Sequence, residues 1–363
     1  MIQCQCGAVS QNARLRKGTP LSLCHCNTCR HLTGLLCTSY YPVEDFHTSD
    51  SIRVYSISAR SNIYFCTTCG CHVARSRKTT QGPLEWDVAT GVVVSSTQDL
   101  NLTYESHKHV QDTQDGGIST WIDLTGHRQV DQHTMFRGED WLHQEDTGVA
   151  DDLLHGSCAC GTVRFEITRP DSASREPSRW LPDLTFPDKT TPDSIKQNPS
   201  DLKWWIPNDG SKFLAGTCVC RSCRLISGFE IQTWAFVPRS NISFLVPGPG
   251  PGQSITQPLD FSTLPRGILQ THSSSPNVLR DFCGKCGATV FWREKGKPDV
   301  LDVSVGLFQA REGARAESWL EWWTDRVSFS EEVGTGRTGS IARTASNLVQ
   351  ALEDGLKVWK HRE

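Results

Sequence analysis

The chemistry of this sequence is concentrated in its 16 cysteines, most of which stand in short motifs with one or two residues between thiols. A Cys-x-Cys pair, a Cys-x-Cys-x-x-Cys run and a Cys-x-x-Cys pair follow one another, and the same order then recurs. The first residues are polar, and no apolar run approaches the roughly 18 residues of a membrane span. In reducing compartments, clustered cysteines usually bind metal rather than pair as disulfides. We therefore expect a cytoplasmic zinc protein without a membrane partner.

The cysteine motifs recur with neighbours of the same type, which identifies an internal repeat. The matched segments are residues 4–9 and 158–163, 24–34 and 218–228, and 65–70 and 282–287. Because their order is the same in both halves, the chain is a tandem duplication. The second half carries two insertions. The interval between its first and middle motifs grows from 18 to 58 residues, and that between its middle and last motifs grows from 37 to 60.

Between the motifs the sequence is mostly strand-like. Residues 162–168, 231–237 and 288–292 are rich in β-branched and aromatic side chains, as short strands are. In the insertions, Pro, Ser and Asp at 170–200 and repeated Pro-Gly at 247–252 favour loops, and these insertions are long enough to cover a pocket. Near the end of the chain, apolar residues fall on one face of a helix: Ile341, Ala345, Leu348, Leu352, Leu356 and Trp359.

These patterns predict a mainly β fold with two tandem zinc-bound domains and a C-terminal helix that packs on domain 2 or on the domain interface. The predicted units are domain 1 at residues 1–125, a linker at 126–151, domain 2 with its insertions at 152–330, and a helical segment at 331–363. Four thiolates around zinc make a closed structural site, whereas three leave a position for water or substrate. The simplest division of seven matched cysteines in each half is therefore four plus three. The two short pairs would form the closed site and the compact middle run the open one.

The order of these cysteines resembles the family of the glutathione-dependent formaldehyde-activating enzyme, also called centromere-protein-V-like. The resemblance covers roughly residues 1–125 and 152–330. It implies β-rich domains with zinc-ribbon-like cores, each with a structural and a catalytic zinc, so up to four zinc ions per chain. The implied structural ligands are Cys4, Cys6, Cys66 and Cys69, then Cys158, Cys160, Cys283 and Cys286. The implied catalytic ligands are Cys24, Cys26 and Cys29, then Cys218, Cys220 and Cys223.

Several residues distinguish the two halves and bear on where catalysis occurs. Cys37 and Cys71 occur in the first half alone, and either could close its open site as a fourth ligand or be a buried free cysteine. Glu230 stands where the first half has Leu36, and it could act as a general acid or base or be a surface residue. Arg224 could hold an anionic substrate group or support the thiolates. We expect domain 2 to be the active half, with Glu230 and Arg224 as candidate catalytic residues.

Three functions follow from these observations. The resemblance implies a zinc-dependent carbon–sulfur lyase, which joins formaldehyde to the thiol of glutathione, and glutathione or a thiol adduct is then the expected small-molecule substrate. A second interpretation is a zinc enzyme of a specialised pathway that uses the same site on a bulkier substrate without glutathione. A third is a non-catalytic zinc interaction module. The net charge of -3 and the lack of a basic stripe weigh against a nucleic-acid partner.

Overall fold

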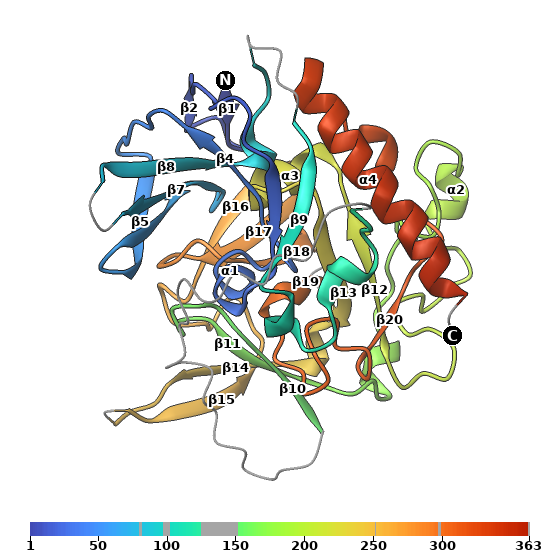
Figure 1. The fold of residues 1–363 in the computed structure, drawn as a ribbon. Coiled ribbons are helices and arrows are strands. Elements are labelled where there is room, and N and C mark those ends of the chain that lie inside the picture. Colours follow the sequence, from blue (N-terminus) through green and yellow to red (C-terminus); the bar gives the residue numbers. More distant parts are fainter. Residues whose placement is uncertain (80–81, 97–101, 125–151, 251, 297–298, 362–363) are drawn as a thin grey trace.

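The computed structural model describes residues 1–79, 82–96, 102–124, 152–250, 252–296 and 299–361. The elements of the first half are β1 (Ile2–Gln3), β2 (Ser10–Gln11), β3 (Leu21–Cys24), α1 (Asn27–Thr33), β4 (Tyr40–Val43), β5 (Ile52–Ser58), β6 (Ser61–Cys66), β7 (His72–Lys78), β8 (Leu84–Ala89), η1 (Thr90–Val92), β9 (Tyr104–Lys108), η2 (Val110–Thr113) and η3 (Gly117–Thr120). Five strands form an antiparallel sheet in the order β4-β8-β7-β6-β5 (Figure 1). The antiparallel pair β1-β2 and the parallel pair β3-β9 accompany this sheet.

The second half repeats this topology with additions. Its elements are β10 (Leu153–Ser157), β11 (Arg164–Thr168), η5 (Ala173–Arg175), α2 (Asp193–Lys196), β12 (Phe213–Cys218), α3 (Arg221–Ser227), β13 (Gln232–Pro238), η6 (Arg239–Asn241), β14 (Ile242–Pro247), β15 (Ser254–Pro258), β16 (Leu269–Ser275), β17 (Val278–Cys283), β18 (Thr289–Glu294), β19 (Val300–Ser304), η7 (Val305–Leu307), β20 (Leu320–Trp322), η8 (Ser330–Glu332) and α4 (Gly339–Lys360). Its large sheet has the order β16-β17-β18-β19-β13-β12-β20, and the first five strands correspond to β5-β6-β7-β8-β4. The prediction of a mainly β fold in two tandem domains with a C-terminal helix is confirmed.

The registers of the two sheets also agree, which allows individual residues to be matched. In the first half Ile63 on β6 lies opposite Arg75 on β7. In the second half Arg280 on β17 lies opposite Trp292 on β18. Ile63 and Arg280 each stand three residues before the last Cys-x-x-Cys pair of their domain, and Arg75 and Trp292 each stand six residues after it. Arg75 and Trp292 therefore occupy equivalent positions. The predicted linker, residues 126–151, lies outside the described residues, and the domain boundaries stay a prediction.

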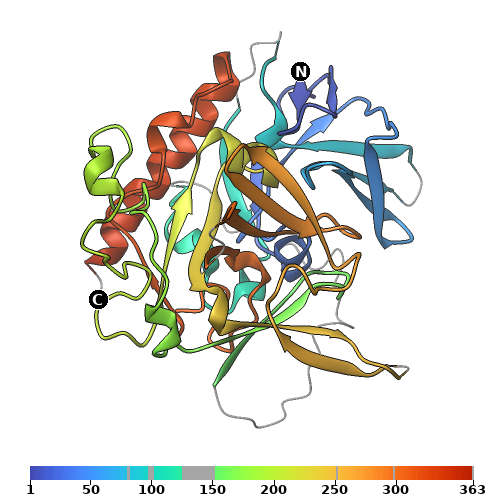
Figure 2. The same ribbon diagram turned by 180° about the vertical axis from the view of Figure 1, so that it is seen from behind.

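The two insertions of domain 2 take different forms. Most of residues 170–206 is irregular apart from η5 and α2, as the composition predicts. The second insertion is instead the hairpin β14-β15, closed by a hydrogen bond from Gly248 N to Gln253 O (2.8 Å) and projecting from the body of the molecule (Figure 2). The composition predicted a loop for this insertion, but the segments on either side of the Pro-Gly turn form strands. Ile242, Phe244 and Val246 alternate toward the core, and that period of two is typical of a strand.

Helix α4 contacts both halves of the chain. Its residues Ile341, Leu348, Leu352 and Leu356 are buried, as the apolar periodicity predicts. Thr344 Oγ1 donates a hydrogen bond to Leu102 O (2.8 Å) in domain 1. The Trp359 ring packs edge-on against Trp121, which in turn contacts Trp322 on β20. The helix therefore lies across the domain interface, beside β9 and β20 (Figure 1).

Four glycines join the halves in a reciprocal, pseudo-twofold arrangement. Gly306 N donates to Gly34 O (3.1 Å), and at the equivalent position Gly91 N donates to Gly228 O (2.9 Å). Gly34 and Gly228 end α1 and α3 in left-handed conformations, with φ near 80° and 83°. A Cβ atom on Gly91 would lie 2.4 Å from Phe229 N, so a side chain does not fit there. The close approach of the halves thus requires glycine at the contact.

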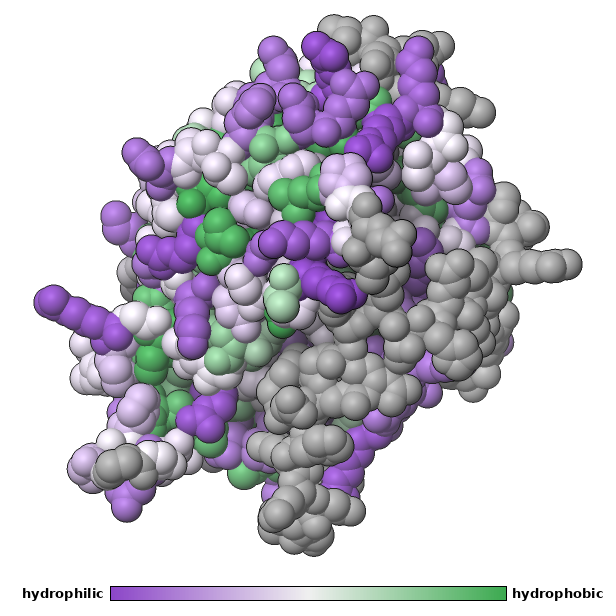
Figure 3. Space-filling model, turned by 60° about the vertical axis from the view of Figure 1, so that its left-hand side comes forward, coloured by the Kyte–Doolittle hydropathy of each residue, from purple (hydrophilic) through white to green (hydrophobic). Residues whose placement is uncertain are grey.

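The buried residues form one continuous hydrophobic core that extends through both halves. On the face shown in Figure 3, hydrophobic residues lie in small groups among hydrophilic ones. Within the described residues, no helix combines the length and the apolar character that crossing a membrane requires. The interface is therefore part of the core, and its disruption should affect the whole chain.

We expect Gly91→Ala to destabilise the protein by about 1–3 kcal/mol, the usual range for a side chain forced into a packed interior. Urea unfolding monitored by circular dichroism measures this loss. Gly334→Ala is the matched control, because a Cβ atom there meets nothing within 4 Å and should change stability by less than about 0.5 kcal/mol. Equal stabilities of the two variants would show that the glycine contact does not hold the halves together.

Candidate metal centres and active site

The thiols predicted to bind metal gather into four clusters, and within each cluster all sulfur atoms lie within 4.8 Å of one another. Each domain contributes one four-thiol and one three-thiol cluster. The four-thiol clusters are Cys4, Cys6, Cys66 and Cys69 in domain 1, and Cys158, Cys160, Cys283 and Cys286 in domain 2. The three-thiol clusters are Cys24, Cys26 and Cys29 in domain 1, and Cys218, Cys220 and Cys223 in domain 2. The structure thus divides the repeated cysteines into the sets that the sequence predicted.

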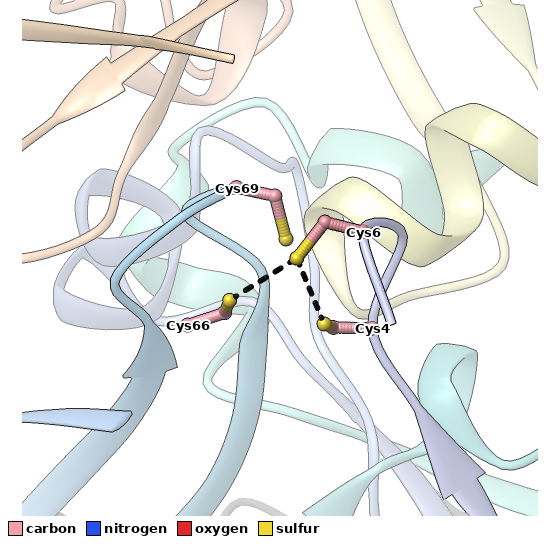
Figure 4. Close-up of side chains that lie close together, drawn as sticks. All are labelled: Cys4, Cys6, Cys66 and Cys69. Carbon is pink, nitrogen blue, oxygen red and sulfur yellow. Dashed lines mark hydrogen bonds between the residues drawn. The ribbon is translucent and has the colours of Figure 1, made fainter. Parts of the chain in front are cut away.

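The sulfur separations in the four-thiol clusters fit a shared metal ion. Cys6 Sγ lies 3.5 Å from Cys4 Sγ and 3.6 Å from Cys66 Sγ (Figure 4). In domain 2, Cys158 Sγ and Cys160 Sγ are 3.4 Å apart. A disulfide needs a separation of about 2.05 Å, whereas four sulfurs around a tetrahedral zinc at about 2.3 Å stand roughly 3.8 Å from one another. These thiols therefore have the arrangement of a closed zinc site.

Tight backbone turns position these thiols. Gly7 and Gly161 follow the first cysteine pair of each domain with φ of 79° and 69°, a conformation that glycine adopts without strain. The turn directs backbone N–H groups at sulfur: Val9 N lies 3.3 Å from Cys4 Sγ, and Val163 N lies 3.3 Å from Cys158 Sγ. The same motif therefore gives the same geometry in both halves.

The three-thiol clusters are formed at the start of a short helix. Cys26 and Cys220 precede α1 and α3, and each sulfur accepts a hydrogen bond from a backbone N–H three residues later, Cys29 N and Cys223 N, at 3.3 Å. This is the N-cap interaction that serine or aspartate usually makes. It fixes two of the three sulfurs on one turn, while the preceding strand supplies the third. Three thiolates can hold zinc and leave one coordination position open.

Cys37 and Cys71 do not belong to any of these clusters. Both are almost fully buried, and burial raises the pKa of each thiol well above its ordinary value. The structure therefore favours the interpretation of buried free cysteines over that of a fourth ligand. It follows that neither residue closes the three-thiol cluster of domain 1, so one reason for expecting activity in domain 2 alone is not supported.

An arginine that the sequence analysis missed contacts the three-thiol cluster of domain 2. Arg280 is buried on β17, and its Nη1 and Nη2 atoms each lie 3.5 Å from Cys223 Sγ. Nη2 also donates to Ser222 Oγ (3.1 Å), and Nε donates to Ser274 Oγ (3.3 Å). Hydrogen bonds from the neighbouring Cys218 and Cys220 thiols, together with the charge of Arg280, lower the pKa of Cys223 well below its ordinary value. The arginine thus favours the thiolate at this position.

Domain 1 has a corresponding arginine, but it comes from the neighbouring strand. Arg75 lowers the pKa of Cys29 in combination with hydrogen bonds from Cys24 and Cys26, which contribute more. Its guanidinium lies over the Tyr40 ring at 4.1 Å and bonds to Asp87 Oδ2 (2.9 Å). The signal in the sequence was an arginine in a strand beside the last cysteine pair, in VLRDFC before the pair of domain 2 and in HVARSRK after that of domain 1. That signal does not say which side chain reaches the thiols.

A cavity of 640 Å³ opens onto the three-thiol cluster of domain 2, and all three cysteines line it. Its other walls come from β13, β17, β18 and the first insertion at residues 179–184. Gln5 of domain 1 also lines it: its Oε1 accepts from His272 Nε2 (2.6 Å), and its Nε2 donates to Ser274 O (3.2 Å). The insertion therefore covers a pocket, as its length suggested, and domain 1 completes that pocket.

The three-thiol cluster of domain 1 has its own, smaller cavity of 220 Å³. Cys24, Cys26 and Cys29 line it together with three cationic side chains, Arg75, Arg77 and Lys108. Both three-thiol clusters are thus reachable from a cavity, and the two cavities differ in volume and charge.

Glu230 and Arg224 do not line the domain 2 cavity. Glu230 is 2% exposed; its carboxylate accepts a hydrogen bond from Thr90 Oγ1 (2.6 Å) and forms an ion pair with Arg337 Nη2 (3.0 Å). Arg224 donates to Gly91 O across the domain interface, and burial lowers its pKa to about 9. Because the contacts of both side chains are with residues at the domain interface, the geometry favours a structural role. Their catalytic role stays a prediction without a contact to support it.

The repeated β-rich fold and the paired cysteine clusters define a tandem protein with four sites that could bind metal. The chain belongs to the family of the glutathione-dependent formaldehyde-activating enzyme, whose model matches residues 1–111 and 207–326. Comparisons with curated proteins and with solved structures gave no match. Cys158 and Cys160 precede the second matched range, because the first insertion separates them from it, yet their thiols meet Cys283 and Cys286 in the structure.

The division into closed and open clusters predicts that two cysteine substitutions reduce the stability of the fold by different amounts. A structural zinc site contributes on the order of 10 kcal/mol, so Cys283→Ser should unfold domain 2 or make the protein insoluble. Cys220→Ser should leave the fold intact with a smaller loss of thermal stability. Circular dichroism and thermal unfolding of the two variants, compared with the unsubstituted protein, measure the difference. Equal destabilisation would contradict the division.

Proposed function

We propose that this chain is a zinc-dependent enzyme of the carbon–sulfur lyase type that acts on a thiol adduct or a carbonyl substrate, with its principal active site in domain 2. The observation that carries the proposal is the 640 Å³ cavity whose lining includes Cys218, Cys220 and Cys223 together. A structural cluster has no need of such access. Membership of a family named after glutathione-dependent formaldehyde activation supports glutathione or a similar thiol as one reactant.

The donor set fits zinc, since three adjacent thiolates are a usual ligand set for this ion. Zinc held by Cys218, Cys220 and Cys223 would supply an open position at which a thiol stays ionised and a carbonyl is polarised. The protein's own contribution is to hold this cluster in place. Arg280 balances negative charge at Cys223 and also donates a hydrogen bond to Ser222 Oγ.

The proposed reaction is addition of a thiol to a carbonyl carbon and its reverse. The sulfur–carbon bond forms as the carbonyl double bond opens, and the thiol proton ends on the carbonyl oxygen. Atoms and electrons balance without an oxidant or reductant, so the reaction requires no redox cofactor. The preference for domain 2 rests on its larger cavity and on the contact between Arg280 and Cys223.

We also propose a cytoplasmic location and a small-molecule partner rather than nucleic acid. All 16 cysteines are free in the structure, which fits a reducing compartment. The net charge of -3 offers no attraction to a polyanion.

The assignment of the active half predicts the outcome of two matched substitutions. Cys223→Ala should abolish turnover of formaldehyde with glutathione, because the zinc of domain 2 loses a ligand, whereas Cys29→Ala should leave most of the activity. Proton NMR of the thiol adduct measures the rate after circular dichroism has shown that both variants fold. Loss of activity in a folded Cys29→Ala protein alone would assign the reaction to domain 1.

A further inference from the structure

The two cavities have diverged at equivalent positions around the same three-thiol cluster. Arg75 and Arg77 of domain 1 stand six and eight residues after Cys69, where domain 2 has Trp292 and Glu294 at the same distances from Cys286. The strand registers agree with this match, and all four side chains line their cavities. Where domain 1 has two cations at its cavity wall, domain 2 therefore has an aromatic ring and a carboxylate.

The domain 2 cavity consequently has no excess of cationic side chains. Besides its three cysteines, the ionisable side chains among its described lining residues are Arg179, Arg221, Arg280, Asp183, Glu294, Asp302 and Glu332. Arg179 is paired with Asp302 (2.8 Å), and Arg280 faces the Cys223 thiolate. Four carboxylates thus stand beside three arginines, so the lining has no excess of positive charge that would offset the lost hydration of an anionic ring against its aromatic wall. The smaller domain 1 cavity, in contrast, has cations and no carboxylate among its described lining residues.

Aromatic side chains form part of the domain 2 cavity wall. Trp180, Trp234, Phe236 and Trp292 line the domain 2 cavity. Trp180, from the first insertion, is 47% exposed. An apolar ligand that covers such an aromatic ring lowers the free energy of the complex. The Trp292 ring is held by the Arg179 guanidinium, which lies 5.0 Å from the ring centre. The cavity therefore offers flat apolar surfaces beside the thiol cluster.

Hydrogen bonds hold the insertion that carries Trp180 against the rest of domain 2. Trp180 O accepts a hydrogen bond from Trp204 Nε1 (3.0 Å). Asp183 on the same insertion accepts from Phe329 N (2.7 Å) and Ser328 Oγ (2.9 Å). The insertion is thus a preformed wall, and a volume of 640 Å³ lies within the range of about 300–1,000 Å³ typical of sites for drug-sized molecules. A formaldehyde molecule would leave most of this volume empty.

We propose that the carbonyl substrate of domain 2 is an uncharged, planar aromatic aldehyde or ketone that lies against Trp180 and Trp292 with its carbonyl group toward Cys223. The placement of the carbonyl group rests on the proposed function, whereas the selection of an uncharged aromatic ring rests on the cavity alone. A thiol adds to the carbonyl carbon, and the thiol proton passes to the carbonyl oxygen, so no further reactant is consumed.

Binding of the fluorescent ketone prodan tests the ring selection directly. Prodan is an uncharged naphthalene whose emission shifts to the blue in an apolar site. We expect saturable, blue-shifted binding that Trp180→Ala weakens at least about threefold, as the loss of an aromatic contact does. Trp292→Arg, which restores the residue type of domain 1, should weaken it further. Ile195→Ala is the matched control, since Ile195 is equally exposed at 47% on the same insertion but does not line the cavity.

Displacement of prodan by two molecules of the same ring system tests the charge selection. Acetonaphthone should displace the probe at a concentration at least about tenfold lower than naphthoate, because the naphthoate carboxylate loses hydration in a cavity whose carboxylates outnumber its arginines. Binding that is absent, unaffected by both tryptophan substitutions, or equally sensitive to naphthoate would overturn the inference. Tryptophan-dependent binding without adduct formation between naphthaldehyde and glutathione would support the ring selection and count against the proposed function alone.

Discussion

The mutual approach of buried thiols is the constraint on which the rest of this structure depends. Sulfur atoms separated by 3.4–3.6 Å, as in the four-thiol clusters, are too far apart for a disulfide and close enough to repel one another as thiolates, and a zinc ion bound among them would offset this repulsion. Each cluster joins the first strands of a domain to the turn after β6 or β17, positions that are at least 60 residues apart in domain 1 and at least 123 in domain 2. A metal ion bound at these clusters would therefore contribute to folding itself.

The three-thiol clusters are linked to the contact between the two domains. The helices that begin at the three-thiol clusters end at Gly34 and Gly228, and these glycines contact η7 and η1 of the opposite half. Displacement of a thiol cluster in one half would shift the helix end that the other half packs against. Gln5 stands between two thiols of the domain 1 structural cluster and also lines the domain 2 cavity. The domain 2 site is consequently complete only in the tandem chain.

The sequence predicted those features that local spacing determines. The four cysteine sets, the strand-rich domains and the helix at 339–360 follow from short motifs and periodicity, and the structure shows them. Arg280 and Glu230 could not be placed in this way, because the direction of their side chains depends on contacts far away in the chain. Arg280 reaches Cys223 across 57 residues, and Glu230 pairs with Arg337 across 107. For the second insertion, the prediction of a loop followed the Pro-Gly composition and did not take into account the alternation of apolar residues that forms β14.

We propose that each domain holds one closed and one open zinc site. Zinc K-edge X-ray absorption and elemental analysis of protein purified without added metal measure both the number of ions and their ligands. We expect close to four zinc ions per chain, sulfur ligands at about 2.3 Å, and an average of about 3.5 sulfurs per zinc, because half of the sites keep one non-sulfur ligand. Two or fewer zinc ions with cysteines paired as disulfides, or a shell dominated by nitrogen and oxygen, would contradict it.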